Sequence, residues 1–152
     1  MGEVENKLTT RRKGGESVLK LYPLDITFFC QGLPMSGDTI QSGKALGGSE
    51  TCAAQMAQTL ARKGHRPIIF CNTEQAHAKD GVTYMPIGWV QQPNGGTFPK
   101  GFLDYARSTP HDLMIVMRIP GVMSWEFKSK VNFLWQHDLA TKTGPSNFHP
   151  TC

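Results

Sequence analysis

The sequence predicts an α/β fold in which an open, parallel sheet has helices on both of its faces. Short apolar runs rich in β-branched and aromatic residues recur along the chain, and residues 25–30 form the first of them. Stretches with helical spacing separate these runs, most clearly over residues 47–64. The runs are almost continuously apolar, which is typical of strands buried on both faces of a parallel sheet. With 152 residues, 39% hydrophobic and 18% charged, the chain fits a single globular domain.

The first strand–helix–strand unit follows a polar segment. Residues 1–24 are expected to form a solvated, disordered arm closed by Pro23, and residues 25–30 then form a buried strand. A long loop rich in glycine, proline and serine spans residues 31–46, and loops of this length are often functional.

A helix is expected to begin at Gly47-Gly48, with Ser49 as its N-cap and alanines on its apolar stripe. Gly64 supplies a left-handed C-terminal cap, and His65 is expected to lie at this helix end. The strand that follows the helix should pair in parallel with residues 25–30.

The remaining elements continue the alternation. Pro86 places the third strand near an edge of the sheet. The expected elements are a strand over residues 67–71, a strand over 82–87, a loop over 91–96, a helix over 99–107, a strand over 112–117, a helical piece over 123–128 and a strand over 131–135.

Charge and composition narrow the class of partner. The net charge of +4 is scattered, and the densest basic cluster, Arg11-Arg12-Lys13, has no interleaved aromatic residues. A solvated arm is therefore favoured over a nucleic-acid contact, while weak attraction to phosphate ligands or to anionic lipid, and so peripheral membrane association, stays open.

Compartment and metal chemistry are predicted from the same composition. No apolar run approaches the roughly 20 residues of a membrane span, and no signal peptide is recognised, so we expect a cytoplasmic protein. The four cysteines form no C-x-x-C pair, which predicts reduced thiols and no metal site.

Three groups of residues are predicted to meet outside the carboxyl ends of the strands. They are the loop over residues 32–48, the segment 118–121 that begins with Arg118, and the His137-Asp138 pair after the last strand. Ligands of open α/β sheets bind at this edge, and we therefore expect the functional site there.

The Gly47-Gly48 pair precedes a helix N-terminus, where exposed backbone N–H groups suit a diphosphate. The alternative is that two glycines simply make the turn into the helix. A dinucleotide dehydrogenase is disfavoured, because the glycines are adjacent and lie far from the first strand, and because Asn72 replaces the ribose-binding carboxylate. A Walker A loop is also absent from the sequence.

These motifs resemble a known family. Leu46-Gly47-Gly48-Ser49-Glu50, a helix ending Leu60-Ala61-Arg62-Lys63-Gly64-His65 and then an apolar strand look like the opening of family 4 glycosyltransferases of the GT-B class. Residues 112–118 are similar to a later strand of that family, and Phe133-Leu134-Trp135-Gln136-His137-Asp138-Leu139 resembles its W-x-H-D segment. The resemblance covers residues 25–140 and implies a Rossmann-like N-terminal domain, followed by a polar tail over residues 141–152.

The resemblance also implies roles for individual residues. Gly47, Gly48 and Glu50 would approach the diphosphate and sugar of the donor. His137 would lie beside the transferred sugar. Asp138 would orient the His137 side chain or contact the acceptor. Arg118 would neutralise an anionic acceptor or a donor phosphate.

The implied reaction is the transfer of a sugar from a nucleotide sugar to an acceptor hydroxyl with retention of configuration. The acceptor would be a glycan, a lipid or a small molecule. No metal or other cofactor is expected, because backbone amides and basic side chains would stabilise the leaving diphosphate.

The sequence departs from the family toward its C-terminal end, where the last elements of the first domain are not recognised and residues 141–152 match no pattern of the family. Family members place the active site between two domains, and the second, nucleotide-binding domain is not recognised in these 152 residues. We therefore expect little or no activity from the chain alone. The alternative hypotheses are a non-catalytic nucleotide- or carbohydrate-binding module on the same scaffold and, more weakly, an unrelated nucleotide-binding α/β enzyme.

Overall fold

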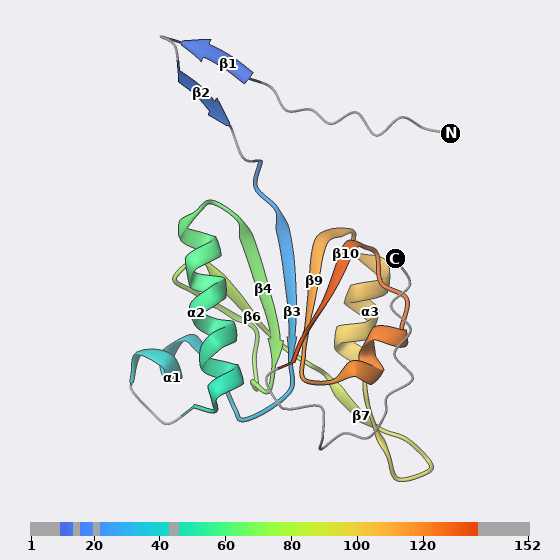
Figure 1. The fold of residues 1–152 in the computed structure, drawn as a ribbon. Coiled ribbons are helices and arrows are strands. Elements are labelled where there is room, and N and C mark those ends of the chain that lie inside the picture. The colour runs from blue at the N-terminus through green and yellow to red at the C-terminus, as the bar shows by residue number, and fades with distance from the viewer. Residues whose placement is uncertain (1–9, 14–15, 20–21, 43–45, 137–152) are drawn as a thin grey trace, which may run out of the picture.

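A computed structural model describes residues 10–13, 16–19, 22–42 and 46–136. Its centre is a six-stranded sheet with the strand order β10-β9-β3-β4-β6-β5 (Figure 1). All neighbouring strands in this sheet run parallel, except that β5 pairs antiparallel with β6. The strands are β3 (Asp25–Cys30), β4 (Arg66–Cys71), β5 (His77–Lys79), β6 (Val82–Pro86), β9 (His111–Met117) and β10 (Ser129–Trp135).

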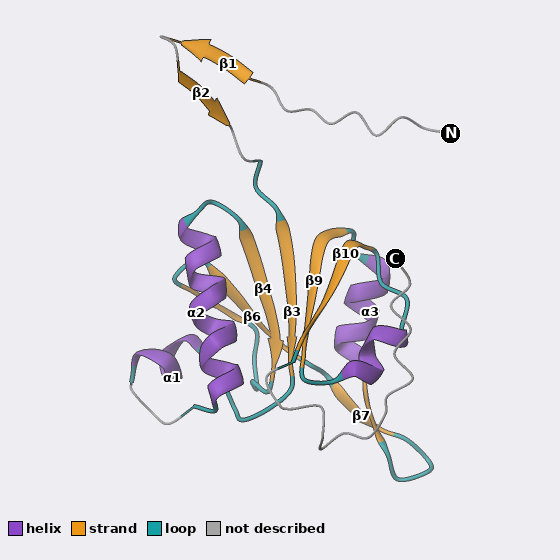
Figure 2. Ribbon diagram, viewed as in Figure 1, coloured by secondary structure: helices purple, strands orange, loops and turns teal. Residues whose placement is uncertain are grey.

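Helices cover the two faces of the sheet, as Figure 2 shows by secondary structure. The helices are α1 (Gly37–Gln41), α2 (Gly48–Arg62) and α3 (Lys100–Ser108), with a 3₁₀ turn, η1 (Pro120–Ser124). The predicted α/β class with a mostly parallel sheet is confirmed, and the architecture is compatible with a Rossmann-like fold.

One core lies between the sheet and α2. Ala53, Ala54 and Ala57 on α2 are fully buried, and they face Phe28 of β3 and Ile69 of β4. Alanine side chains let the helix axis lie close to the strands, as the sequence predicts. The helix ends as expected, because Gly64 has a φ of +88° that suits glycine.

A second core lies on the opposite face, beneath α3. Phe102, Leu103 and Ala106 form the buried side of this helix, as predicted. The Phe102 ring packs against Phe29 of β3 and Phe70 of β4, with ring centroids 4.4 and 5.3 Å away. A single sheet therefore supports two cores that share its strands.

The third strand lies near an edge of the sheet, as predicted, with one further strand outside it. β6 is not at the edge of the sheet, because the short strand β5 pairs with it on the outer side. Asp80 (φ +52°) and Gly81 (φ +77°) make the tight turn between them. Pro86 is the last residue of β6, where its missing N–H leaves the pairing nearly intact.

Two small antiparallel sheets were not predicted. β1 (Thr10–Lys13) and β2 (Glu16–Leu19) pair within the segment predicted to be a disordered arm. β7 (Trp89–Gln91) and β8 (Thr97–Pro99) form a hairpin around the predicted loop. The predicted helical piece over 123–128 is instead η1, which begins at Pro120 because proline suits a first helical turn.

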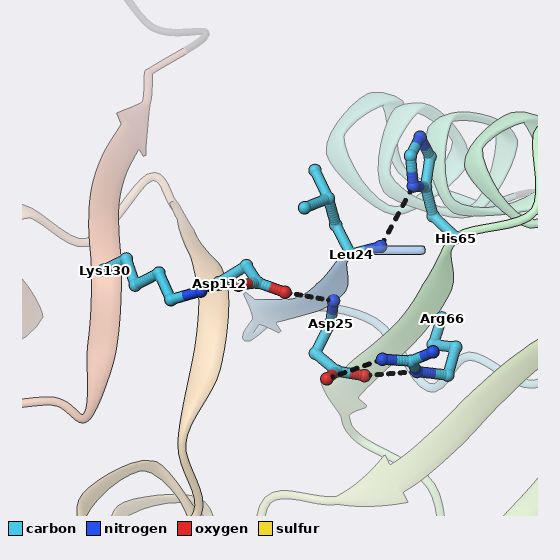
Figure 3. A network of polar contacts seen from close by, with 6 residues as sticks. All are labelled: Leu24, Asp25, His65, Arg66, Asp112 and Lys130. Carbon is cyan, nitrogen blue, oxygen red and sulfur yellow. Dashed lines mark hydrogen bonds and ion pairs between the residues drawn. The ribbon is translucent and has the colours of Figure 1, made fainter. Parts of the chain in front are cut away.

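A polar network joins the amino ends of four neighbouring strands (Figure 3). Arg66 donates two hydrogen bonds to the carboxylate of Asp25, of 2.6 and 2.9 Å. Asp112 accepts from the Asp25 backbone N–H at 2.8 Å and from Lys130 Nζ at 2.6 Å. The His65 side chain does more than end the helix, since its Nδ1 accepts from the Leu24 N–H at 3.2 Å. These contacts link β3, β4, β9 and β10 at the edge opposite the predicted site.

In the described part of the chain, no helix is long and apolar enough to cross a bilayer.

Candidate functional site at the carboxyl edge of the sheet

The candidate site lies where the parallel strands end, at the lower edge of the molecule in Figure 1. The N-terminus of α2, the loop after β3 and the residues that follow β4 and β9 all reach this edge. Two of the three predicted groups therefore have described residues at this edge, namely residues 32–42 and 46–48 of the loop and the segment that begins with Arg118. The third group, His137 and Asp138, lies outside the described residues.

Glu50, in the first turn of α2, is buried beside the loop between β3 and α2, which carries Gly32 and Gly47 and is called the glycine loop below. Its side chain is only 3% exposed, and Oε1 accepts a hydrogen bond from the Leu33 N–H at 2.9 Å. A Cβ atom on Gly32 would lie 1.7 Å from Glu50 Oε1, and one on Gly47 would lie 2.2 Å from Oε2. Glu50 thus binds the loop between β3 and α2, and two glycines are needed to make room for its carboxylate.

Gly48 differs from Gly47. It is exposed, and a Cβ atom built on it would meet no heavy atom within 4 Å. The helix N-cap is Gly47, which offers no side-chain hydrogen bond, and the predicted N-cap Ser49 is instead buried in the first turn. The first turn of α2 therefore has no side-chain cap of its own, and its N–H groups are suited to an anion.

Asn72 is a site residue that the sequence analysis missed as such. It follows β4, its Nδ2 donates to the Gly32 carbonyl, and its backbone carbonyl accepts from the Met35 N–H at 3.1 Å. Its Oδ1 accepts from the indole of the half-exposed Trp89 at 3.2 Å. The signal was present, because Asn72 is a polar residue that directly follows an apolar strand.

Arg118 occupies the predicted position after β9 with an uncommon backbone conformation. Its φ is +66°, and its N–H donates to the Trp135 carbonyl at 3.0 Å. A non-glycine residue in the left-handed region costs about 1–2 kcal/mol, so strain of this kind often marks a functional position. The side chain of Arg118 is exposed.

The charges of Glu50 and Arg118 both affect the pKa of the Cys30 thiol. The pKa of the Cys30 thiol is raised to about 12, chiefly by burial and also by the charge of Glu50, while Arg118 acts in the opposite direction. Cys30 ends β3, so the carboxylate and the guanidinium both lie within electrostatic reach of this strand end. A high pKa keeps the thiol protonated, and Cys30 is not a nucleophile here.

A polar hollow of about 530 Å³ opens beside the glycine loop. It lies between the start of α1 and the segment after β4, and its walls are Pro34, Met35, Ser36, Asp38, Thr39 and residues 72–77. His77 Nε2 accepts a hydrogen bond from the Gly37 N–H at 3.2 Å, while Nδ1 lies 3.1 Å from the Gln75 carbonyl oxygen. Both imidazole nitrogens are thus engaged with the walls of the hollow.

Among the described residues, no group of three or more histidine, cysteine, aspartate or glutamate side chains is placed to hold a metal ion. Comparisons with protein-family models, with curated proteins and with solved structures found no match.

Proposed function

We propose that this chain is the N-terminal, acceptor-side domain of a retaining GT-B glycosyltransferase of the family 4 type. The resemblance of residues 46–50, 60–65 and 133–139 to that family supports the proposal. The observation that carries it is the open backbone at Gly48, at the N-terminus of α2 and at the carboxyl edge of the sheet.

The residues would act on the leaving group through electrostatics. Departure of the sugar leaves negative charge on the donor diphosphate, and the N–H groups of the first turn of α2 would stabilise that charge. The guanidinium of Arg118 would contribute from the end of β9. Glu50 would not contact the donor, because its carboxylate is buried and bound to the loop.

The acceptor would enter the hollow beside the glycine loop. Its walls carry the hydroxyl groups of Ser36 and Thr39, which suit a ligand with several hydroxyl groups, while Asn72 and His77 hold the walls in place through their own hydrogen bonds. His137 and Asp138 would complete the site next to the transferred sugar, and a second domain would hold the nucleotide.

Gly48→Val tests the role of the open backbone. A Cβ atom at this position meets no heavy atom within 4 Å, so stability should change by less than about 0.5 kcal/mol, whereas a ligand could no longer approach the N–H groups. We would express the 152-residue chain, together with any longer product of the same reading frame, and assay transfer and hydrolysis with UDP-, GDP- and ADP-sugars.

Gly48→Val should lower kcat/KM about a hundredfold, and Gly48→Ala should lower it less. His137→Ala should abolish transfer. A protein that uses none of these donors, as the 152-residue chain or as any longer product, would refute the transferase. Binding of a nucleotide sugar without turnover would instead support the non-catalytic binding module.

A further inference from the structure

One face of β10 is bare in the described part of the chain. Val131 is 49% exposed and Phe133 57% exposed, although both belong to a strand of the central sheet. Phe133 stands next to Ile115 of β9 in register, on the same face as α2. A hollow of about 340 Å³ lies between this face and α2, lined by Met56, Ile115, Phe133, Leu134, Trp135 and Gln136. Parallel sheets are normally covered on both faces, so we expect other protein side chains to pack against this apolar surface.

The outer edge of β10 is also open to pairing. β10 is the last strand in the order of the sheet, and no described strand lies beyond it. The Trp135 carbonyl accepts from Arg118, so odd-numbered residues of β10 turn their backbone groups toward β9. The N–H and C=O groups of Asn132 and Leu134 therefore point outward.

β10 lacks the features that usually protect an edge strand. It spans seven residues without proline, and the ammonium of its single lysine, Lys130, is engaged by Asp112 at 2.6 Å. The opposite edge strand, β5, has only three residues. Lys79 on β5 is paired with Asp38 just as Lys130 is paired with Asp112, so the two edges differ in strand length rather than in free charge. A short strand offers few groups for edge pairing, so β5 is the better protected of the two edges.

We propose that β10 pairs antiparallel with β10 of a second copy of this chain, about a two-fold axis through Phe133. In this register the outward groups of Asn132 meet those of Leu134 of the second copy, which gives a hydrogen-bonded pair. Phe133 lies opposite Phe133 of the second copy, and Val131 lies opposite Trp135 of the second copy. Lys130 lies opposite Gln136 of the second copy, so no like charges oppose each other.

This pairing gives hydrogen-bond partners to the open edge of β10 and also brings apolar side chains next to its exposed face. It makes one continuous sheet from two chains, and the apolar side chains at residues 131, 133 and 135 of both copies form a single stripe. Side chains of the second copy can then approach the hollow beside Met56. A two-fold axis is the usual symmetry of such self-complementary interfaces.

The oligomeric state of the full 152-residue chain tests the proposal. We expect a concentration-dependent dimer in sedimentation equilibrium. Phe133→Glu and Phe133→Lys each place like charges at the axis, so each should raise the dimer Kd by at least about tenfold. An equimolar mixture of the two variants should recover the dimer, because glutamate then faces lysine.

Leu33→Glu is the matched control, since Leu33 is 52% exposed but lies in the loop after β3. It should leave the dimer unchanged, and far-UV circular dichroism should show that all variants are folded. A monomer at every concentration reached overturns the proposal, as does a dimer that survives Phe133→Glu. Slow amide exchange at Asn132 and Leu134 in a monomer would also overturn it, because the edge would then be covered by the same chain.

Discussion

At the scale of single residues, the candidate site depends on side chains that shape the backbone rather than on exposed reactive groups. Glu50 is buried and holds the Leu33 N–H, and Asn72 holds the Gly32 carbonyl. The glycine pair at 47–48 therefore has two separate roles. Gly47 makes room for the Glu50 carboxylate, whereas Gly48 leaves open space in front of the helix. Sequence reasoning treated the two glycines alike, because a single sequence does not show which neighbour occupies the space beside each one.

A double-mutant cycle tests this division. Gly47→Ala should destabilise the protein by about 2 kcal/mol, because the methyl group would collide with the Glu50 carboxylate. Glu50→Ala should cost a similar amount, since it leaves the Leu33 N–H without its acceptor. The double variant should cost clearly less than the sum, because the collision is removed with the carboxylate.

Urea unfolding of the four proteins measures the coupling between the two positions. Additive losses would contradict the close packing of Gly47 on Glu50. Gly48→Ala is the control, and it should lie within about 0.5 kcal/mol of the parent chain.

At the scale of elements, the apolar runs and helix signals were sufficient to predict most of the sheet. The strand at Asp25–Cys30, the inner face of α3 and the end of α2 at Gly64 are confirmed. One strand of the central sheet was missed. β5 has three residues and little hydrophobicity, so no periodic pattern could reveal it, and it forms the edge outside β6. The cap of α2 was misassigned because Ser49 suits an N-cap, whereas packing against the sheet buries it.

The polar network at the amino ends of the strands should make stability depend on pH. A hydrogen bond from Arg66 holds the pKa of Asp25 below its ordinary value of 3.8. The ammonium of Lys130 and the Asp25 N–H likewise lower the pKa of Asp112. A carboxyl group whose pKa is lowered by folding stabilises the protein above its ordinary pKa, and this contribution disappears as pH falls through the lower, folded value. Stability should therefore fall as pH drops below about 4.

Asp112→Asn removes the charge but keeps an acceptor for the Asp25 N–H. It should cost about 1 kcal/mol at pH 7, because the pair with Lys130 is partly exposed to solvent, and less at pH 3. Asp104→Asn serves as the control, since Asp104 forms an exposed pair with Lys100. Thermal unfolding at both pH values provides the measurement. A loss at pH 3 as large as that at pH 7 would argue against a charge effect.

At the scale of the whole molecule, two cores share one sheet. Phe28 and Ile69 face α2, while Phe29 and Phe70, their neighbours along the same strands, face α3. The carboxyl edge is therefore supported from both faces, and the glycine loop and Arg118 are held by a common set of strands. Because neither core can lose its strands without exposing the other, we expect the central domain to unfold as one cooperative unit.

A matched pair of substitutions tests this cooperativity. Ile69 belongs to the core beneath α2 and Ile87 to the core beneath α3, and both are almost fully buried. Ile69→Val and Ile87→Val each remove one methylene group, so each should cost about 0.5–1.5 kcal/mol. If the sheet couples the cores, each variant should lower the urea midpoint of the whole transition without changing the m-value. Far-UV circular dichroism and tryptophan fluorescence should then give coincident curves for both variants, since Trp135 packs on one core and Trp125 on the other. If the circular dichroism and fluorescence curves separate in only one variant, the core that carries that substitution unfolds on its own. The candidate site would then be supported from a single face of the sheet.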